Sequence, residues 1–207
     1  SKIYTTLDQE AYPKAGTANP IVSLYVHDLA TRKSIRVDAA SGDPTLAEYV
    51  YEVRWSPKGD ELLFHRTNRK QNRMQFCAAN PRTGAIRVIL EESHPESWAD
   101  NSPEILWLED KRRFLWASER DGFKNYYLYD LSGKLLNAVT QNEFDSDRIV
   151  GVDEKRGEVY YLARSGDTPY LAQLHRVGLN GKGDRRLTDP KLSHAVALAP
   201  GFETFLD

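Results

Sequence analysis

The sequence predicts an all-β fold built from repeated four-stranded units. Pairs of short apolar runs joined by tight turns recur along the 207 residues, and sustained helical periodicity is absent. The anchors of these pairs lie 52, 45 and 46 residues apart, at Trp55, Trp107, Val152 and Leu198. Four-stranded units repeating every 40–50 residues or so are typical of β-propeller blades, so we expect a propeller segment.

The clearest hairpin opens the first complete unit. Residues 53–64 are predicted to form strand, turn and strand, because Pro57 fixes φ and Gly59 supplies a positive φ between two apolar runs. Each unit then continues with two more strands. The equivalent hairpins of the following units are residues 105–116, 149–162 and 195–206.

The units divide the single domain, residues 1–207, into about four antiparallel blades. Three are complete, and two half-blades flank them, the first supplying third and fourth strands and the last supplying first and second strands. One short helical turn is expected at residues 43–49, after Pro44. The expected blades are residues 12–40 (partial), 50–92, 103–142, 148–190 and 193–207 (partial).

The two half-blades leave strand edges that can template association. They would combine into a fourth blade if the ring closed on itself. We expect instead the curvature of a wider ring, with open edges or with head-to-tail pairing of two chains in a homodimer. A strand at Ile21–Val26 then does not pair with residues 203–206.

Two tryptophans test the repeat alignment. Trp55 and Trp107 occupy equivalent positions in the first strands of their units. We therefore expect both indoles to be largely buried between blades. Full exposure of both would show that the alignment is off by one residue, since such a slip moves a side chain to the other face of its strand.

Composition and motifs argue against several function classes. With 28 Lys and Arg against 30 Asp and Glu, and no tract of one sign, neither a nucleic-acid partner nor a membrane partner is expected. The sequence has no Gly-x-Ser-x-Gly motif, and its five histidines lack metal-ligand spacing. No catalytic residue, cofactor or metal is therefore expected. The charged turn at residues 118–122 is interpreted as a solvated hairpin loop, with a ligand-contacting loop as the alternative.

Two motifs resemble those of the dipeptidyl-peptidase IV-like serine peptidases of the prolyl oligopeptidase superfamily. Residues 12–20, Tyr-Pro-Lys-Ala-Gly-Thr-Ala-Asn-Pro, resemble the family's Y-P-K-A-G-x-x-N-P stretch, and residues 114–123 with 127–130 resemble its blade signature. The resemblance implies the C-terminal half of an eight-bladed N-terminal propeller. It also implies a partner, a C-terminal α/β-hydrolase domain carrying a Ser-Asp-His triad.

The resemblance further implies a parent exopeptidase that releases N-terminal Xaa-Pro or Xaa-Ala dipeptides from peptide substrates, in the periplasm or outside the cell. The propeller would gate the active-site chamber. Relatives bring an aromatic residue and an arginine to the substrate from the loop that follows the residue matched by Trp98. Here residues 100–103 read Asp-Asn-Ser-Pro, with neither. Trp98 and Asn101 are the candidate residues of this substrate-chamber loop.

Two alternatives remain. A TolB-like propeller that binds proteins would share the Trp-Ser-Pro-x-Gly hairpin. What the gene encodes after Asp207 would distinguish the two, because a Gly-x-Ser-x-Gly strand, turn and helix favours the peptidase and a stop codon favours the TolB-like propeller. A relative of prolyl oligopeptidase or acylaminoacyl-peptidase is disfavoured by the Tyr-Pro-Lys-Ala-Gly stretch.

Overall fold

The computed structural model describes residue 7 and residues 14–207. The start of the Tyr-Pro-Lys-Ala-Gly stretch, Tyr12 and Pro13, and with it the start of the first partial unit, lies outside the described residues. Within them the chain is all-β, as predicted, apart from one 3₁₀ turn, η1 (Pro44–Ala47). Asp43 caps this turn by accepting a hydrogen bond from the Thr45 amide at 3.0 Å.

Three four-stranded antiparallel sheets form the body of the molecule, and within each sheet strands adjacent in sequence are paired. The first consists of β3 (Tyr49–Trp55), β4 (Leu62–Thr67), β5 (Arg73–Ala79) and β6 (Ile86–Ser93). The second consists of β7 (Ile105–Trp107), β8 (Arg113–Ser118), β9 (Asn125–Asp130) and β10 (Leu135–Ala138). The third consists of β11 (Ser146–Asp153), β12 (Glu158–Ala163), β13 (Gln173–Gly178) and β14 (Arg185–Arg186).

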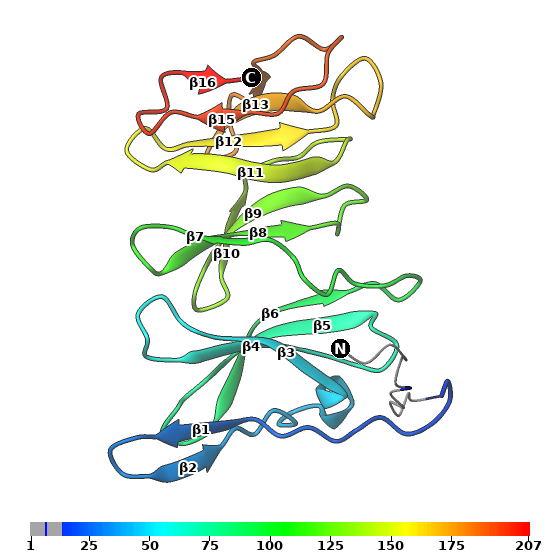
Figure 1. Cartoon of the computed structure of the whole chain (residues 1–207), viewed down its shortest axis with the longest axis vertical. Helices are drawn as coiled ribbons and strands as arrows, with labels where there is room; N and C mark the ends of the chain where they lie inside the picture. The colour runs from blue at the N-terminus through cyan, green and yellow to red at the C-terminus, as the bar shows by residue number, and fades with distance from the viewer. Residues whose placement is uncertain (1–6, 8–13) are drawn as a thin grey trace, which may run out of the picture.

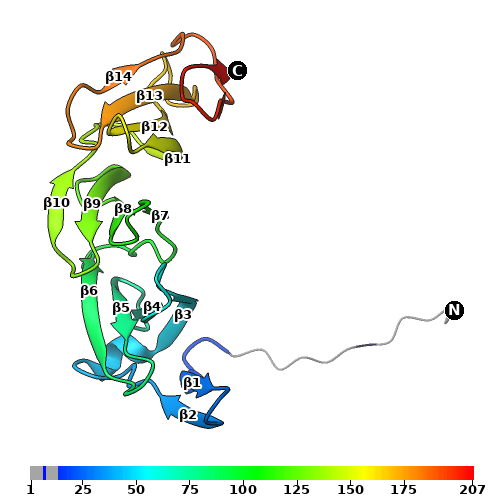
Figure 2. The same ribbon diagram turned by 90° about the vertical axis from the view of Figure 1, so that its left-hand side faces the viewer.

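A two-stranded sheet lies at each end of the stack (Figure 1). β1 (Tyr25–Asp28) pairs with β2 (Lys33–Arg36), and β15 (Ala197–Leu198) pairs with β16 (Phe205–Leu206). The first strand therefore begins at Tyr25, so its predicted span, Ile21–Val26, was wrong in its bounds. The five sheets form a curved column with the two half-blades at opposite ends (Figure 2). In the described chain the two half-blades do not pair, which confirms the open arc.

The strand register confirms the repeat alignment. Each of the four anchors pairs with the residue seven positions later, across the turn that joins the first two strands of its unit. The pairs are Trp55 with Leu62, Trp107 with Phe114, Val152 with Val159, and Leu198 with Phe205. One hairpin geometry thus recurs four times despite unrelated side chains.

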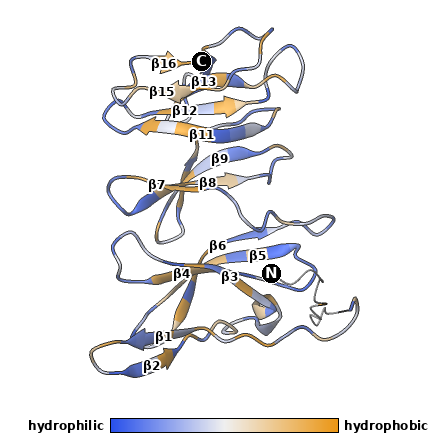
Figure 3. Cartoon of the chain, viewed as in Figure 1, coloured by the Kyte–Doolittle hydropathy of each residue, from blue (hydrophilic) through white to orange (hydrophobic). Residues whose placement is uncertain are grey.

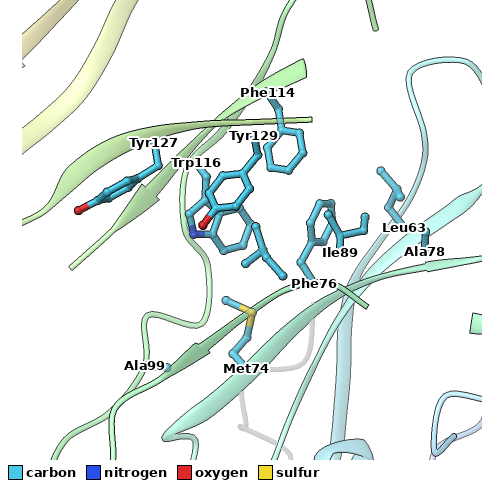
Figure 4. Packing of buried hydrophobic residues seen from close by; sticks show 11 residues of the cluster. Leu63, Met74, Phe76, Ala78, Ile89, Ala99, Phe114, Trp116, Tyr127 and Tyr129 are labelled. Carbon is cyan, nitrogen blue, oxygen red and sulfur yellow. The ribbon is translucent and has the colours of Figure 1, made fainter. Parts of the chain in front are cut away.

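Apolar side chains between adjacent sheets hold the column together. One such cluster joins Leu63, Met74 and Phe76 of the first complete sheet to Phe114 and Trp116 of the second (Figure 4). The rings of Phe76 and Trp116 stack with centroids 5.6 Å apart. Hydrophobic residues are concentrated in the strands, whereas much of the loop ribbon is hydrophilic (Figure 3).

The prediction that both anchor tryptophans are largely buried was wrong. Trp107 is partly buried against the cluster that includes Phe114, but Trp55 is 51% exposed. Directly paired residues share a face of the sheet. Trp55 lies opposite Leu62, which packs toward the β1–β2 sheet, and that sheet places only two strands there in the described structure. Trp55 thus has the expected orientation, and no neighbour among the described residues covers it fully.

Glycine sets the spacing between blades. Gly133 has φ +95°, and a Cβ built on it would lie 2.1 Å from the carbonyl oxygen of Ile89 in the preceding blade. Gly84 makes the same approach one blade earlier, with φ +75° and a Cβ position 2.0 Å from the Arg36 oxygen. The turn between third and fourth strands can approach the neighbouring blade this closely only because it carries no side chain.

Candidate functional site

The long loops lie at one edge of the column. In an antiparallel blade, the turn between second and third strands and the connection to the next blade both lie at the same edge. Residues 68–72, 94–104, 118–124 and 164–172 therefore face one way, toward the right of Figure 1. The turns between first and second strands, such as residues 56–61, lie at the opposite edge.

Trp98 and Asn101 differ in exposure and in contacts. Trp98 is 82% exposed and borders an open depression of about 770 Å³ that is also lined by Lys70 and Glu96. Asn101 is part-buried, its amide donates to the Gln71 side chain, and its Oδ1 lies 3.5 Å from the Tyr51 hydroxyl. Trp98 thus lies exposed at the depression, whereas Asn101 braces the loop that carries it.

A second depression of about 370 Å³ lies on the other side of this brace. Its lining includes Tyr51, Gln71 and Asn101 together with Pro20 and Val22 of the N-terminal segment. Burial raises the pKa of Tyr51 above its usual range, so its hydroxyl stays protonated and can donate a hydrogen bond. The depression is largely apolar, with a few polar groups, as small-ligand sites generally are.

Backbone contacts fix the two loops to each other. The Ala99 amide donates to the Gln71 carbonyl at 2.9 Å, and the His94 amide donates to the Asn72 carbonyl at 2.8 Å. Ala99 is buried in the cluster between the first two complete blades. The loop that bears the exposed indole is therefore anchored on both sides of Trp98.

The described end of the Tyr-Pro-Lys-Ala-Gly stretch reaches the same edge. The Arg69 guanidinium donates to the Thr17 carbonyl, and the Asn19 amide donates to Glu48 at 3.2 Å. The stretch carrying one part of the family resemblance and the loop of Trp98 are thus joined through residues 68–72. This convergence could not be read from the sequence, since the two segments lie about eighty residues apart.

The charged turn at residues 118–122 is not simply solvated, which corrects the sequence interpretation. Arg120 donates to Glu92 at 2.6 Å and to the Tyr129 hydroxyl at 2.8 Å, and its guanidinium lies 4.2 Å from the centre of the Tyr127 ring. Glu92 is 7% exposed and also accepts from the Trp116 indole at 2.9 Å. This turn fastens two blades together, and sequence reasoning missed Glu92 because its partners lie in another unit.

The described residues hold no group of three or more His, Cys, Asp or Glu side chains placed to ligate a metal ion. Among the same residues, no helix is long and apolar enough to cross a membrane.

Comparison with known proteins gives a consistent result. A dipeptidyl peptidase 4 of Trichophyton equinum is 25% identical over 156 residues, and one of Arthroderma otae is 28% identical over 158 residues. Each alignment covers 73% of this chain and 20% of the relative. The chain therefore spans about a fifth of the length of these relatives.

Solved structures agree. The dipeptidyl peptidase 4 of Porphyromonas gingivalis superposes with a TM-score of 0.72 at 25% identity, covering 86% of this chain and 24% of that one. A putative dipeptidyl aminopeptidase IV of Bacteroides ovatus superposes with a TM-score of 0.73 at 26% identity, covering 96% and 30%.

The family model described as "Dipeptidyl peptidase IV (DPP IV) N-terminal region" matches residues 1–207, the whole sequence. Together with the four-stranded sheets and the superposed peptidases, this match decides the family. The chain belongs to the family of the dipeptidyl peptidase IV N-terminal region.

Proposed function

We propose that this chain is a non-catalytic propeller part of a serine exopeptidase that releases N-terminal Xaa-Pro or Xaa-Ala dipeptides. Its role is to wall the active-site chamber and to restrict entry to peptides that can pass the loop edge. The observation that carries the proposal is the family match over every residue of the chain. The proposed activity is the one in the name of the relatives called dipeptidyl peptidase 4.

The chemistry belongs to a partner, an α/β-hydrolase domain with a Ser-Asp-His triad. The sequence of this chain has no Gly-x-Ser-x-Gly motif, which such a domain needs to present its nucleophile. The relatives are about five times longer than the matched segment and have room for such a domain.

The loop edge suits a chamber wall. Trp98 presents an indole that is 82% exposed, a flat apolar surface against which a peptide or a proline ring can pack. Lys70 stands beside it as an exposed cation on the same depression. Because Ala99, Gln71 and Asn101 hold this loop in place, the wall is fixed and does not need to fold around each substrate.

The test uses a polypeptide in which residues 1–207 are joined to the hydrolase domain. Trp98→Ala is compared with Leu29→Ala, an 88% exposed residue at the opposite edge. The kcat/KM values are measured for a short Xaa-Pro substrate and for a long peptide with the same N-terminus. We expect Trp98→Ala to raise kcat/KM for the long peptide relative to kcat/KM for the short substrate. Leu29→Ala should leave this ratio unchanged. Equal ratios in all three proteins would contradict the gating role.

A further inference from the structure

The third complete blade brings together a serine, a histidine and an aspartate that are separated in the sequence. The Ser165 hydroxyl lies 2.6 Å from Nε2 of His175, and Nδ1 of His175 lies 3.2 Å from Oδ1 of Asp184. Ser165 follows β12, His175 lies within β13, and Asp184 immediately precedes β14. Three neighbouring segments of one sheet therefore supply the three side chains.

The order of contacts matches that of acyl-transfer triads. In those sites the carboxylate holds Nδ1–H of the imidazole, which leaves Nε2 to accept the proton of the serine hydroxyl. Here Asp184 is placed to select that tautomer. The hydroxyl of Tyr161 donates to the second carboxylate oxygen of Asp184 at 2.8 Å and so fixes its orientation.

The surroundings hold the imidazole in place. His175 is 6% exposed, and its ring lies 5.2 Å from that of Tyr161 and 5.6 Å from that of Phe144, measured between centroids. Burial raises the pKa of Tyr161 above its usual range, so the phenol remains a donor. Ser165 itself is part-exposed, next to the exposed segment that begins at Asp167.

The site differs from a full hydrolase centre in its oxyanion donors. The amide of Gly166, next to the serine, donates to the Leu171 carbonyl at 3.3 Å. The Arg186 guanidinium donates to the Ser165 carbonyl at 2.9 Å. General-base activation of the hydroxyl is therefore present, while the amide pair that stabilises a tetrahedral intermediate is not among these contacts.

We propose that Ser165 is an activated nucleophile and a site of covalent modification by phosphonyl or acyl compounds with good leaving groups. With a fluorophosphonate, the Ser165 oxygen attacks phosphorus, the O–P bond forms and the P–F bond breaks. Fluoride leaves with the bonding electron pair. The hydroxyl proton passes to Nε2 of His175 and from there to water. Unactivated peptides do not react, because their poor leaving group requires oxyanion stabilisation.

The test treats the protein with a fluorophosphonate probe and quantifies modified serines by mass spectrometry of peptides. Ser132 serves as an internal reference, because its hydroxyl contacts the Asp130 carboxylate with no imidazole beside it. We expect Ser165 to be modified far faster than Ser132. His175→Gln should slow the modification by about 100-fold or more, the usual worth of general-base catalysis, and Asp184→Asn should slow it in the same direction.

Modification of Ser165 at the rate of Ser132 would overturn the proposal. That comparison is made in the unaltered protein, so it decides the question even if a variant fails to fold. Where His175→Gln folds, with the same thermal midpoint as the parent, an unchanged rate at Ser165 would equally overturn it. Neither result bears on the proposed gating role, which concerns the loop of Trp98.

Discussion

Arg120 and Glu92 lie on adjacent blades, and Nη2 of the arginine is 2.6 Å from Oε1 of the glutamate. The glutamate side chain is 9% exposed and the arginine side chain 28%. Because the same carboxylate oxygen also accepts the Trp116 indole, one buried group joins the last strand of one blade to two elements of the next.

Removing this carboxylate should destabilise the protein. Glu92→Ala leaves the Arg120 guanidinium and the Trp116 indole without their acceptor, so we expect a loss of about 2–4 kcal/mol in the free energy of unfolding. Glu61→Ala is the matched control, since Glu61 pairs with Arg87 at 2.7 Å nearer the surface and should contribute about 1 kcal/mol or less. Urea unfolding measures both variants. Equal losses would contradict the assigned role of Glu92.

The spacing between blades gives a second prediction. Gly133→Ala places a Cβ against the Ile89 carbonyl in addition to the strain of φ +95°, and we expect a loss of about 3 kcal/mol or more. Gly59→Ala carries only the strain of φ +72°, since a Cβ there meets nothing within 4 Å, and should cost about 1–2 kcal/mol. Thermal or urea unfolding compares the two. A Gly133 variant no less stable than the Gly59 variant would refute close approach between blades.

His65 predicts a dependence of stability on pH. Burial, followed by the charge of Arg54, lowers the pKa of this histidine from 6.5 to about 4. The unfolded chain therefore binds the proton first as the pH falls. The contribution of neutral His65 is fully present above pH 6.5 and is lost progressively down to pH 4, amounting to roughly 3 kcal/mol. His65→Phe, among the rings of Tyr51, Phe76 and Trp116, should remove this part of the acid dependence. Identical pH profiles from urea unfolding would contradict the assignment.

The chain by itself should not release dipeptides from Xaa-Pro chromogenic substrates. Its sequence lacks a nucleophile elbow, and the Gly166 amide beside Ser165 is engaged by the Leu171 carbonyl. The measurement is product release by the purified chain, with Ser165→Ala as the control. Hydrolysis that a serine-directed inhibitor abolishes would overturn this prediction.

The sequence predicted the repeats well because turn chemistry is local. Pro57 and Gly59 mark a hairpin in their own segment, and the seven-residue pairing of Trp55 with Leu62 follows from that turn. It could not predict the exposure of Trp55, which depends on how many strands the neighbouring sheet supplies.

The sequence also could not predict contacts that form only in the folded chain. Glu92 gains its role only from Arg120 and Trp116, which belong to the next blade. Ser165, His175 and Asp184 belong to one unit, but they meet only because β12, β13 and β14 pair in a particular register, which their spacing in the sequence does not reveal. The resemblance, in turn, pointed to Trp98 and Asn101 without distinguishing the exposed residue from the bracing one.

The most direct test of the chamber-wall role is photo-crosslinking from the loop edge. A photoreactive phenylalanine analogue is placed at position 98, or at position 29 on the opposite edge, in the polypeptide that carries the hydrolase domain. Each protein is irradiated with a slowly cleaved peptide that begins Xaa-Pro. We predict a crosslink to the peptide from position 98 and none from position 29. Crosslinking from position 29 alone, or equally from both positions, would contradict the proposal that this edge faces the substrate.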